Sequence, residues 1–261
     1  MAIDPRIRAR RVAVRRQEGR RRLRFLLGAV GLIALAVAAW GLTRTPLLDL
    51  DHVRYEGVAD ADAAEVAATT GLEPGTAMFD LDLGGVERDL MALPWVSSAT
   101  ASRDWPGTVR IVVVAREAVA VVGAGSGPAF LADVDGVLIR PASPDSGLPR
   151  VAVEPTAGLG GTQVDALPAI EVAIAVPDDL RPWVDAVTID GGSGEPVHLG
   201  LDLIGSAEAV LGSGDFIDDK LAAVRAVLQR VELACLDVID VAVADSPVTT
   251  RDEACEGGVD G

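Results

Sequence analysis

The chain has little of the side-chain chemistry on which most enzymes and metal sites depend. Its 261 residues include two histidines, two cysteines and one tyrosine, and aromatic residues make up only 3% of the sequence. His52 and His198 lie far apart, and neither stands in the Cys/His spacing of a metal site. The carboxylates are scattered over expected turns and helix surfaces, where solvated side chains are usual. The sequence therefore predicts no catalytic residues, no metal and no cofactor, and so a protein that is not an enzyme.

Positive charge is scarce outside the first 24 residues. Residues 1–24 carry ten arginines and two carboxylates, a net charge of +8, whereas the rest of the chain carries 13 basic and 37 acidic residues, a net of −24. Such an acidic body is repelled by phosphate backbones, which argues against nucleic-acid binding. The basic segment is instead suited to contact anionic membrane lipid.

One long uncharged run separates the basic segment from the acidic body. Residues 25–42 read FLLGAVGLIALAVAAWGL, and as a helix they span roughly 27 Å, about the thickness of a bilayer's hydrocarbon core. We expect a single transmembrane helix, with residues 1–24 cytoplasmic and everything after it extracytoplasmic, because basic flanks stay inside. A cleaved signal peptide is the alternative, since residues 36–38 read Ala-Val-Ala, a possible cleavage site.

The first part of the body, residues 53–122, predicts a small domain of β-α-α-β-β order after a linker at 43–52. Residues 53–58 alternate as a strand does, residues 60–70 are helical with Gly71 placed to end the helix, and a second helix carries an apolar stripe. Strands are expected over 95–103 and 108–122. The stripe of the second helix consists of Leu83, Val86, Leu90 and Leu93.

The second part, residues 130–251, predicts a β-rich mixed α/β domain after a glycine-rich linker at 123–129. Its clearest elements are a hairpin over 130–139, a helix over 217–231, a strand over 236–244 and a short last strand over 248–251. Residues 252–261 are expected to be a flexible tail. The fold class is therefore α+β, with two domains following the transmembrane helix.

Two runs in the first domain carry a family resemblance. Residues 93–99 read LPWVSSA and residues 103–111 read RDWPGTVRI, which resembles the end of the POTRA domain in the FtsQ/DivIB family of bacterial cell-division proteins. Ala115 and Ala118 depart from the usual residues. KLAAVRAVL and LDVIDVAVADSPV, at 220–228 and 236–248, are similar to the β-domain of that family. Trp95 and Trp105 are expected to be core and turn anchors rather than ligand contacts.

This resemblance implies a function in cell division. It implies a non-enzymatic single-pass scaffold of the division septum, whose β-domain docks FtsB, which pairs with FtsL, and which helps regulate septal peptidoglycan synthesis. Septal peptidoglycan synthase components are further candidate partners. A short last strand leaves main-chain groups free for strand addition. Carried onto this chain, the contact falls on the segment from 246 to 251, which consists of Ser246, Pro247, Val248, Thr249, Thr250 and Arg251.

Two other functions are alternatives to the division scaffold. A POTRA-bearing transport or assembly protein would also handle extended polypeptides, and an exported hydrolase would need a concentrated polar site that the sequence lacks.

Cys235 and Cys255 are expected to form a disulfide if the turn pairs Ala244 with Pro247, because that register sets Cys235 opposite Glu256, next to Cys255. The alternative is two free thiols.

Overall fold

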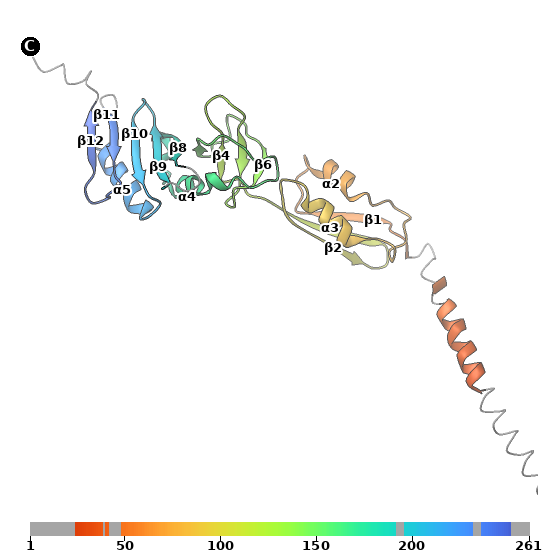
Figure 1. Cartoon of the computed structure of the whole chain (residues 1–261). Helices are drawn as coiled ribbons and strands as arrows, with labels where there is room; N and C mark the ends of the chain where they lie inside the picture. The colour runs from red at the N-terminus through yellow and green to blue at the C-terminus, as the bar shows by residue number, and fades with distance from the viewer. Residues whose placement is uncertain (1–23, 39, 42–47, 192–195, 232–235, 252–261) are drawn as a thin grey trace, which may run out of the picture. The chain divides into compact units, whose positions relative to one another are not determined.

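The computed structural model describes residues 24–38, 40–41, 48–191, 196–231 and 236–251. Figure 1 colours the described residues from red near the N-terminus to blue near the C-terminus. The chain forms two compact units. The first consists of the residues up to 87 together with 100–112, and the second consists of 88–99 together with the residues from 113 onwards.

The predicted membrane segment is partly described. Residues 24–38 and 40–41 are helical, and the side chains of 24–38 are exposed. No helix within the described ranges is both long and apolar enough to cross a bilayer.

The first body elements follow the predicted order of strand, helix, helix, strand, strand. They are β1 (His52–Glu56), α2 (Ala63–Thr70), α3 (Leu83–Met91), β2 (Val96–Asp104) and β3 (Thr108–Ala115). The strands form one sheet in the order β1-β3-β2, in which β1 runs parallel to β3. Gly71 ends α2 in the left-handed region, at φ 57°, as the sequence predicted.

The strand predicted over 108–122 is wrong, because the main chain changes partners between 115 and 120. The Arg116 N–H donates to the Trp95 carbonyl at 2.8 Å, whereas the Val119 N–H donates to the Ala132 carbonyl at 2.8 Å. Residues 120–122 therefore form a separate strand, β4, in a different sheet. Apolar residues predominate on both sides of Arg116 and Glu117, so the hydrophobic pattern alone did not reveal this change.

The second sheet has nine strands in the order β12-β11-β10-β9-β8-β7-β4-β5-β6. Most neighbours are antiparallel, and β4–β7, β7–β8 and β10–β11 are parallel. Two α-helices and two 3₁₀ helices accompany the sheet. The elements are β4 (Ala120–Val122), β5 (Phe130–Ala132), β6 (Leu138–Pro141), β7 (Arg150–Val151), η2 (Val164–Ala166), α4 (Leu167–Ala175), η3 (Arg181–Trp183), β8 (Val184–Asp190), β9 (His198–Leu203), β10 (Glu208–Gly212), α5 (Ile217–Leu228), β11 (Leu236–Asp240) and β12 (Val248–Arg251).

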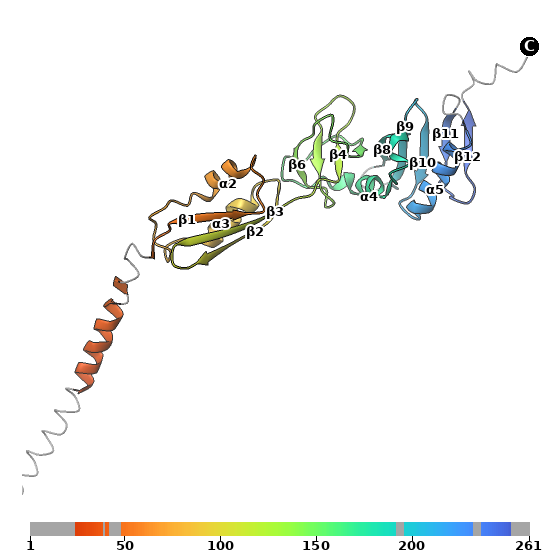
Figure 2. The ribbon, with the colours of Figure 1, turned by 180° about the vertical axis from the view of Figure 1, so that it is seen from behind.

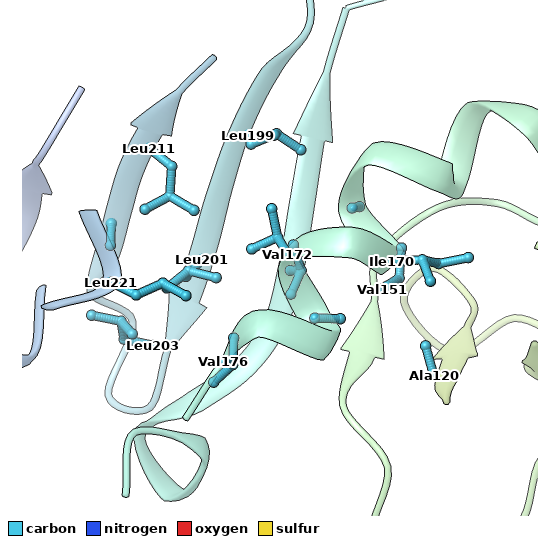
Figure 3. Close-up of a cluster of buried hydrophobic side chains, with 14 of the residues drawn as sticks. Ala120, Val151, Ile170, Val172, Val176, Leu199, Leu201, Leu203, Leu211 and Leu221 are labelled. Atoms are coloured by element: carbon cyan, nitrogen blue, oxygen red, sulfur yellow. The ribbon is translucent and has the colours of Figure 1, made fainter. Parts of the chain in front are cut away.

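Both helices α4 and α5 pack on the same face of this sheet. Leu199, Leu201 and Leu203 alternate along β9 with His198, Gly200 and Asp202, and the three leucines share one buried cluster with residues of both helices. Figure 3 shows Val172 of α4 on the side of Leu199 and Leu201, and Ile170 of the same helix beside Val151 of β7. The opposite face carries no helix among the described residues, and we call it the open face.

The α4 contact is testable with two isoleucines of the same helix. Ile170 is fully buried and Ile174 is 43% exposed. We expect Ile170→Ala to lower the free energy of unfolding by about 2–5 kcal/mol, because it removes buried methyl groups and leaves a cavity. Ile174→Ala, the matched control, is expected to cost less than about 1 kcal/mol. Urea denaturation followed by circular dichroism measures both, and equal losses would contradict the packing.

Candidate functional site

The two edges of the nine-stranded sheet differ in how their main chain is used. At the β6 edge, the Leu138 N–H donates to the Gly161 carbonyl at 3.0 Å, and its carbonyl accepts from the Gly160 N–H at 2.8 Å. The Gln163 N–H donates to the Gly136 carbonyl at 2.9 Å. The segment 160–163 therefore covers the start of the β6 edge and satisfies the main-chain groups of Leu138, which a further strand would need.

Gln163 holds that segment in place from inside. Its side chain is 1% exposed, and its Oε1 accepts from the N–H groups of Thr156 and Ala157, both at 2.9 Å. Its Nε2 donates to the Asp165 carboxylate at 2.6 Å. The sequence analysis missed this residue, because a lone glutamine in a loop gives no local signal of burial.

The β12 edge is open. β12 pairs with β11, its single neighbour among the described residues, and all four of its residues are exposed. Figure 2 shows β12 beside β11 at the end of the sheet. In an antiparallel pair, every second residue directs its N–H and C=O away from the neighbour. The outer side of β12 therefore presents main-chain donors and acceptors to solvent.

The six residues predicted for partner binding all lie on this edge or just before it. Val248, Thr249, Thr250 and Arg251 form β12 itself. Ser246 and Pro247 precede it and are exposed, and the Ser246 N–H donates to the Val243 carbonyl at 3.0 Å. The structure thus brings the predicted segment together as one exposed strand and its turn.

The predicted register of this strand is wrong by three residues. β11 ends at Asp240, whose carboxylate accepts from the Ala242 N–H at 2.9 Å, and Val248 pairs with Asp240. The connection is therefore longer than the tight turn that was expected to pair Ala244 with Pro247. The Asp240 side chain caps the end of β11, and the alternation of apolar residues in the sequence does not reveal this local interaction.

This register removes the argument that set Cys235 beside Cys255. Leu236 lies opposite Arg251, which differs from the pairing that the disulfide prediction assumed. Cys235 and Cys255 themselves lie outside the described residues. The disulfide therefore stays a prediction.

The register also assigns the side chains of β12 to the two faces of the sheet. Thr249 lies opposite Ile239, which is buried on the helix-covered side, whereas Val248 and Thr250 lie opposite Asp240 and Val238 on the open face. Val248 is 60% exposed. A strand added at this edge would meet one apolar side chain, two threonines and the positive charge of Arg251.

The open face carries a group of carboxylates farther into the sheet. Asp202 on β9 lies opposite Glu208 on β10. Burial raises the pKa of Asp202 above its ordinary 3.8, and the charges of Asp185 and Asp190 raise it further. Within the described residues, no three or more His, Cys, Asp or Glu are grouped so that they could hold a metal ion.

The raised pKa of Asp202 predicts a pH-dependent stability effect. Ionisation of the Asp202 carboxyl costs more free energy in the folded chain than in the unfolded chain. Ionised Asp202 therefore destabilises the fold above the raised pKa. This cost disappears as pH falls below 3.8. We expect Asp202→Asn to be more stable than the parent at about pH 7, with the difference shrinking towards about pH 4.

Urea midpoints at several pH values measure the Asp202→Asn effect. Asp145→Asn removes an exposed carboxylate from a loop and is the matched control. A stability difference for Asp202→Asn that stays constant with pH, or that follows the control, would contradict the assignment.

Comparison with known proteins agrees with the geometry of the first domain and extends beyond it. Residues 48–116 match the POTRA domain of FtsQ type. This range contains all five elements from β1 to β3 and ends where the main chain begins to change partners.

The similarity to cell division protein FtsQ continues through most of the chain. The relative from Mycolicibacterium smegmatis is 26% identical over 211 residues, which cover 80% of this chain and 61% of the relative. The relative from Mycobacterium leprae is 27% identical over 202 residues, covering 76% of this chain and 57% of the relative. The chain thus spans about three fifths of the length of these two proteins.

A third relative is covered over more of its length. Cell division protein FtsQ of Geotalea daltonii is 25% identical over 243 residues, which cover 86% of this chain and 85% of the relative. Because both the domain match and the longer alignments agree, the chain is similar to FtsQ cell-division proteins over most of its length, with a match to the FtsQ-type POTRA domain at residues 48–116.

Proposed function

We propose that this chain is a non-enzymatic scaffold of the bacterial division complex, which binds an FtsB-type partner by adding a strand of that partner to β12. The observation that carries the proposal is the difference between the two sheet edges. β12 is exposed along all four residues, whereas the segment 160–163 already covers the start of the β6 edge. An extended peptide can therefore extend the sheet at β12 without displacing described structure.

In strand addition the main chain supplies most of the affinity and the side chains supply the specificity. The main-chain hydrogen bonds hold any extended peptide, and the side chains beside them select its sequence. Val248 and Thr250 would contact the partner on the open face and Thr249 on the other face, while Arg251 would favour an acidic partner residue. An FtsL-type protein would join through FtsB, and septal peptidoglycan synthase components would be regulated by the assembled complex.

We further propose that residues 25–42 anchor the protein in the cell membrane. The helix at 24–38 exposes its apolar side chains, which suits a lipid environment better than water. The ten arginines of residues 1–24 would keep that end cytoplasmic and in contact with lipid headgroups. Both folded domains would then lie outside the cytoplasm, at the division septum, and their acidity argues against nucleic acid as a partner.

Proline at position 248 tests the edge. We expect Val248→Pro to lower partner capture about tenfold or more, because proline removes one N–H and restrains the strand. The fold is expected to survive, since Val248 is exposed and is the first residue of β12. Co-purification of the FtsB-type protein with full-length chain measures capture, and circular dichroism checks folding.

Val248→Thr is the matched control for the proline variant. It keeps the N–H and the β-branched shape, so capture is expected to stay close to that of the parent. Unchanged capture by a folded Val248→Pro variant would place the interface elsewhere, and equal losses in both variants would assign the contact to the valine side chain.

Cellular location separates this function from the alternative of a transport or assembly protein that handles extended polypeptides. We expect a fluorescent fusion of the full chain to form a band at midcell in dividing cells, and deletion of residues 25–42 to abolish that band. Fluorescence microscopy with membrane fractionation measures both. A uniform membrane signal from the full chain would contradict the division function, and retention of the deleted form in membranes would contradict the anchor.

A further inference from the structure

We propose that Phe79 and Trp105 form a second docking site, on the FtsQ-type POTRA domain, for a protein segment in which an apolar side chain is flanked by Lys or Arg. The two rings lie 4.8 Å apart between centroids and are tilted by 44°. Phe79 is 55% exposed and Trp105 is 46% exposed. Exposed tryptophan in a contiguous apolar patch is typical of an energetic centre of a protein interface.

The pair is held rigidly rather than left exposed on a loose loop. Phe79 lies between Met78, which is fully buried, and Leu81, which is 8% exposed. The Arg103 guanidinium donates to main-chain carbonyls on both sides of Phe79. Its Nε donates to Met78 at 2.7 Å, and its Nη2 donates to Leu81 at 2.6 Å. The loop is thereby fastened to the end of β2, so little conformational entropy remains to be lost when a partner binds.

Trp105 is positioned from the other side by the hairpin between β2 and β3. The Gly107 carbonyl accepts from the N–H groups of Asp51 at 2.7 Å and His52 at 3.1 Å. A side chain at position 107 would collide with the main chain, because a Cβ there would lie 2.9 Å from the Asp49 carbonyl oxygen, and it would also meet the Asp51 carboxylate. Glycine at this position therefore allows the hairpin tip to pack closely against the segment that leads into β1.

The charge around the rings selects the class of partner. The three segments that build the site, 48–51, 77–82 and 103–107, contain five aspartates and a single arginine, Arg103. Arg110 adds one cation near Asp104, at 3.5 Å. A basic protein segment would gain electrostatic attraction and cation–π contact with the Trp105 ring. A bilayer surface with anionic lipid would be repelled by the same carboxylates, so a protein is favoured as the occupant.

This surface is independent of the β12 edge, since it uses residues of the other compact unit. Its occupation would let the chain hold a second protein while the sheet edge is engaged.

Photo-crosslinking in the native cells tests the site. Full-length chain with p-benzoylphenylalanine in place of Phe79 is irradiated, and the attached peptide is identified by mass spectrometry. The same probe in place of Phe216, which is 78% exposed in the other unit, reports random collisions. We expect a protein adduct that the Phe216 probe does not give, on a peptide with Lys or Arg beside an apolar residue.

Two sets of variants decide whether the adduct depends on the proposed contacts. Trp105→Ala, and separately Asp80→Lys with Asp104→Lys, are each expected to lower the adduct yield about tenfold or more. Asp145→Lys with Asp218→Lys reverses two exposed charges elsewhere and is expected to leave the yield unchanged. The charge variants keep the test valid even if Trp105→Ala fails to fold.

Several results would overturn the proposal. These are adducts with lipid alone, with a second copy of this chain, or with a peptide that lacks basic residues, as well as the absence of any adduct. A yield that is unaffected by charge reversal at positions 80 and 104 would also overturn it.

Discussion

Main-chain hydrogen bonding at the sheet edges is the constraint on which this structure depends. Every strand residue carries a donor and an acceptor that must be paired or solvated, because burying either without a partner costs free energy. The chain meets this requirement differently at its two edges. Gly160 and Gly161 approach β6 closely enough to pair with Leu138, whereas the outer side of β12 is left to water.

The packing of the sheet explains why β12 is suited to exchange water for a partner. Its four residues are exposed and contribute no side chain to the buried cluster, whereas Ile239 on the neighbouring strand is fully buried. β11 is therefore anchored by apolar contacts, and β12 is held largely by its pairing with β11. An added strand would give β12 a second neighbour and stabilise it, since free energy of local opening is lowest where buried contacts are few.

The two proposed surfaces use the same physical strategy with different groups. At β12 the main chain is presented in extended form, and at Phe79 and Trp105 two rings are presented by a loop that Arg103 fastens. In both places the scaffold determines geometry in advance, so association loses less conformational entropy. Neither surface requires reactive side chains, which fits a chain with two histidines, two cysteines and similarity to FtsQ proteins.

The sequence by itself determined the periodic elements, the POTRA-type motif and the exposed last strand. These features depend on local sequence: a short β-branched run at 248–250 after a turn, a glycine after α2, and the run around Trp95 and Trp105. Tertiary structure alone decided that residues 120–122 join another sheet, that Val248 pairs with Asp240, and that Gln163 supports the segment covering the start of the β6 edge. Each of these rests on a main-chain or buried hydrogen bond between distant segments, and hydrophobic periodicity contains no information about which distant partner a backbone group will find.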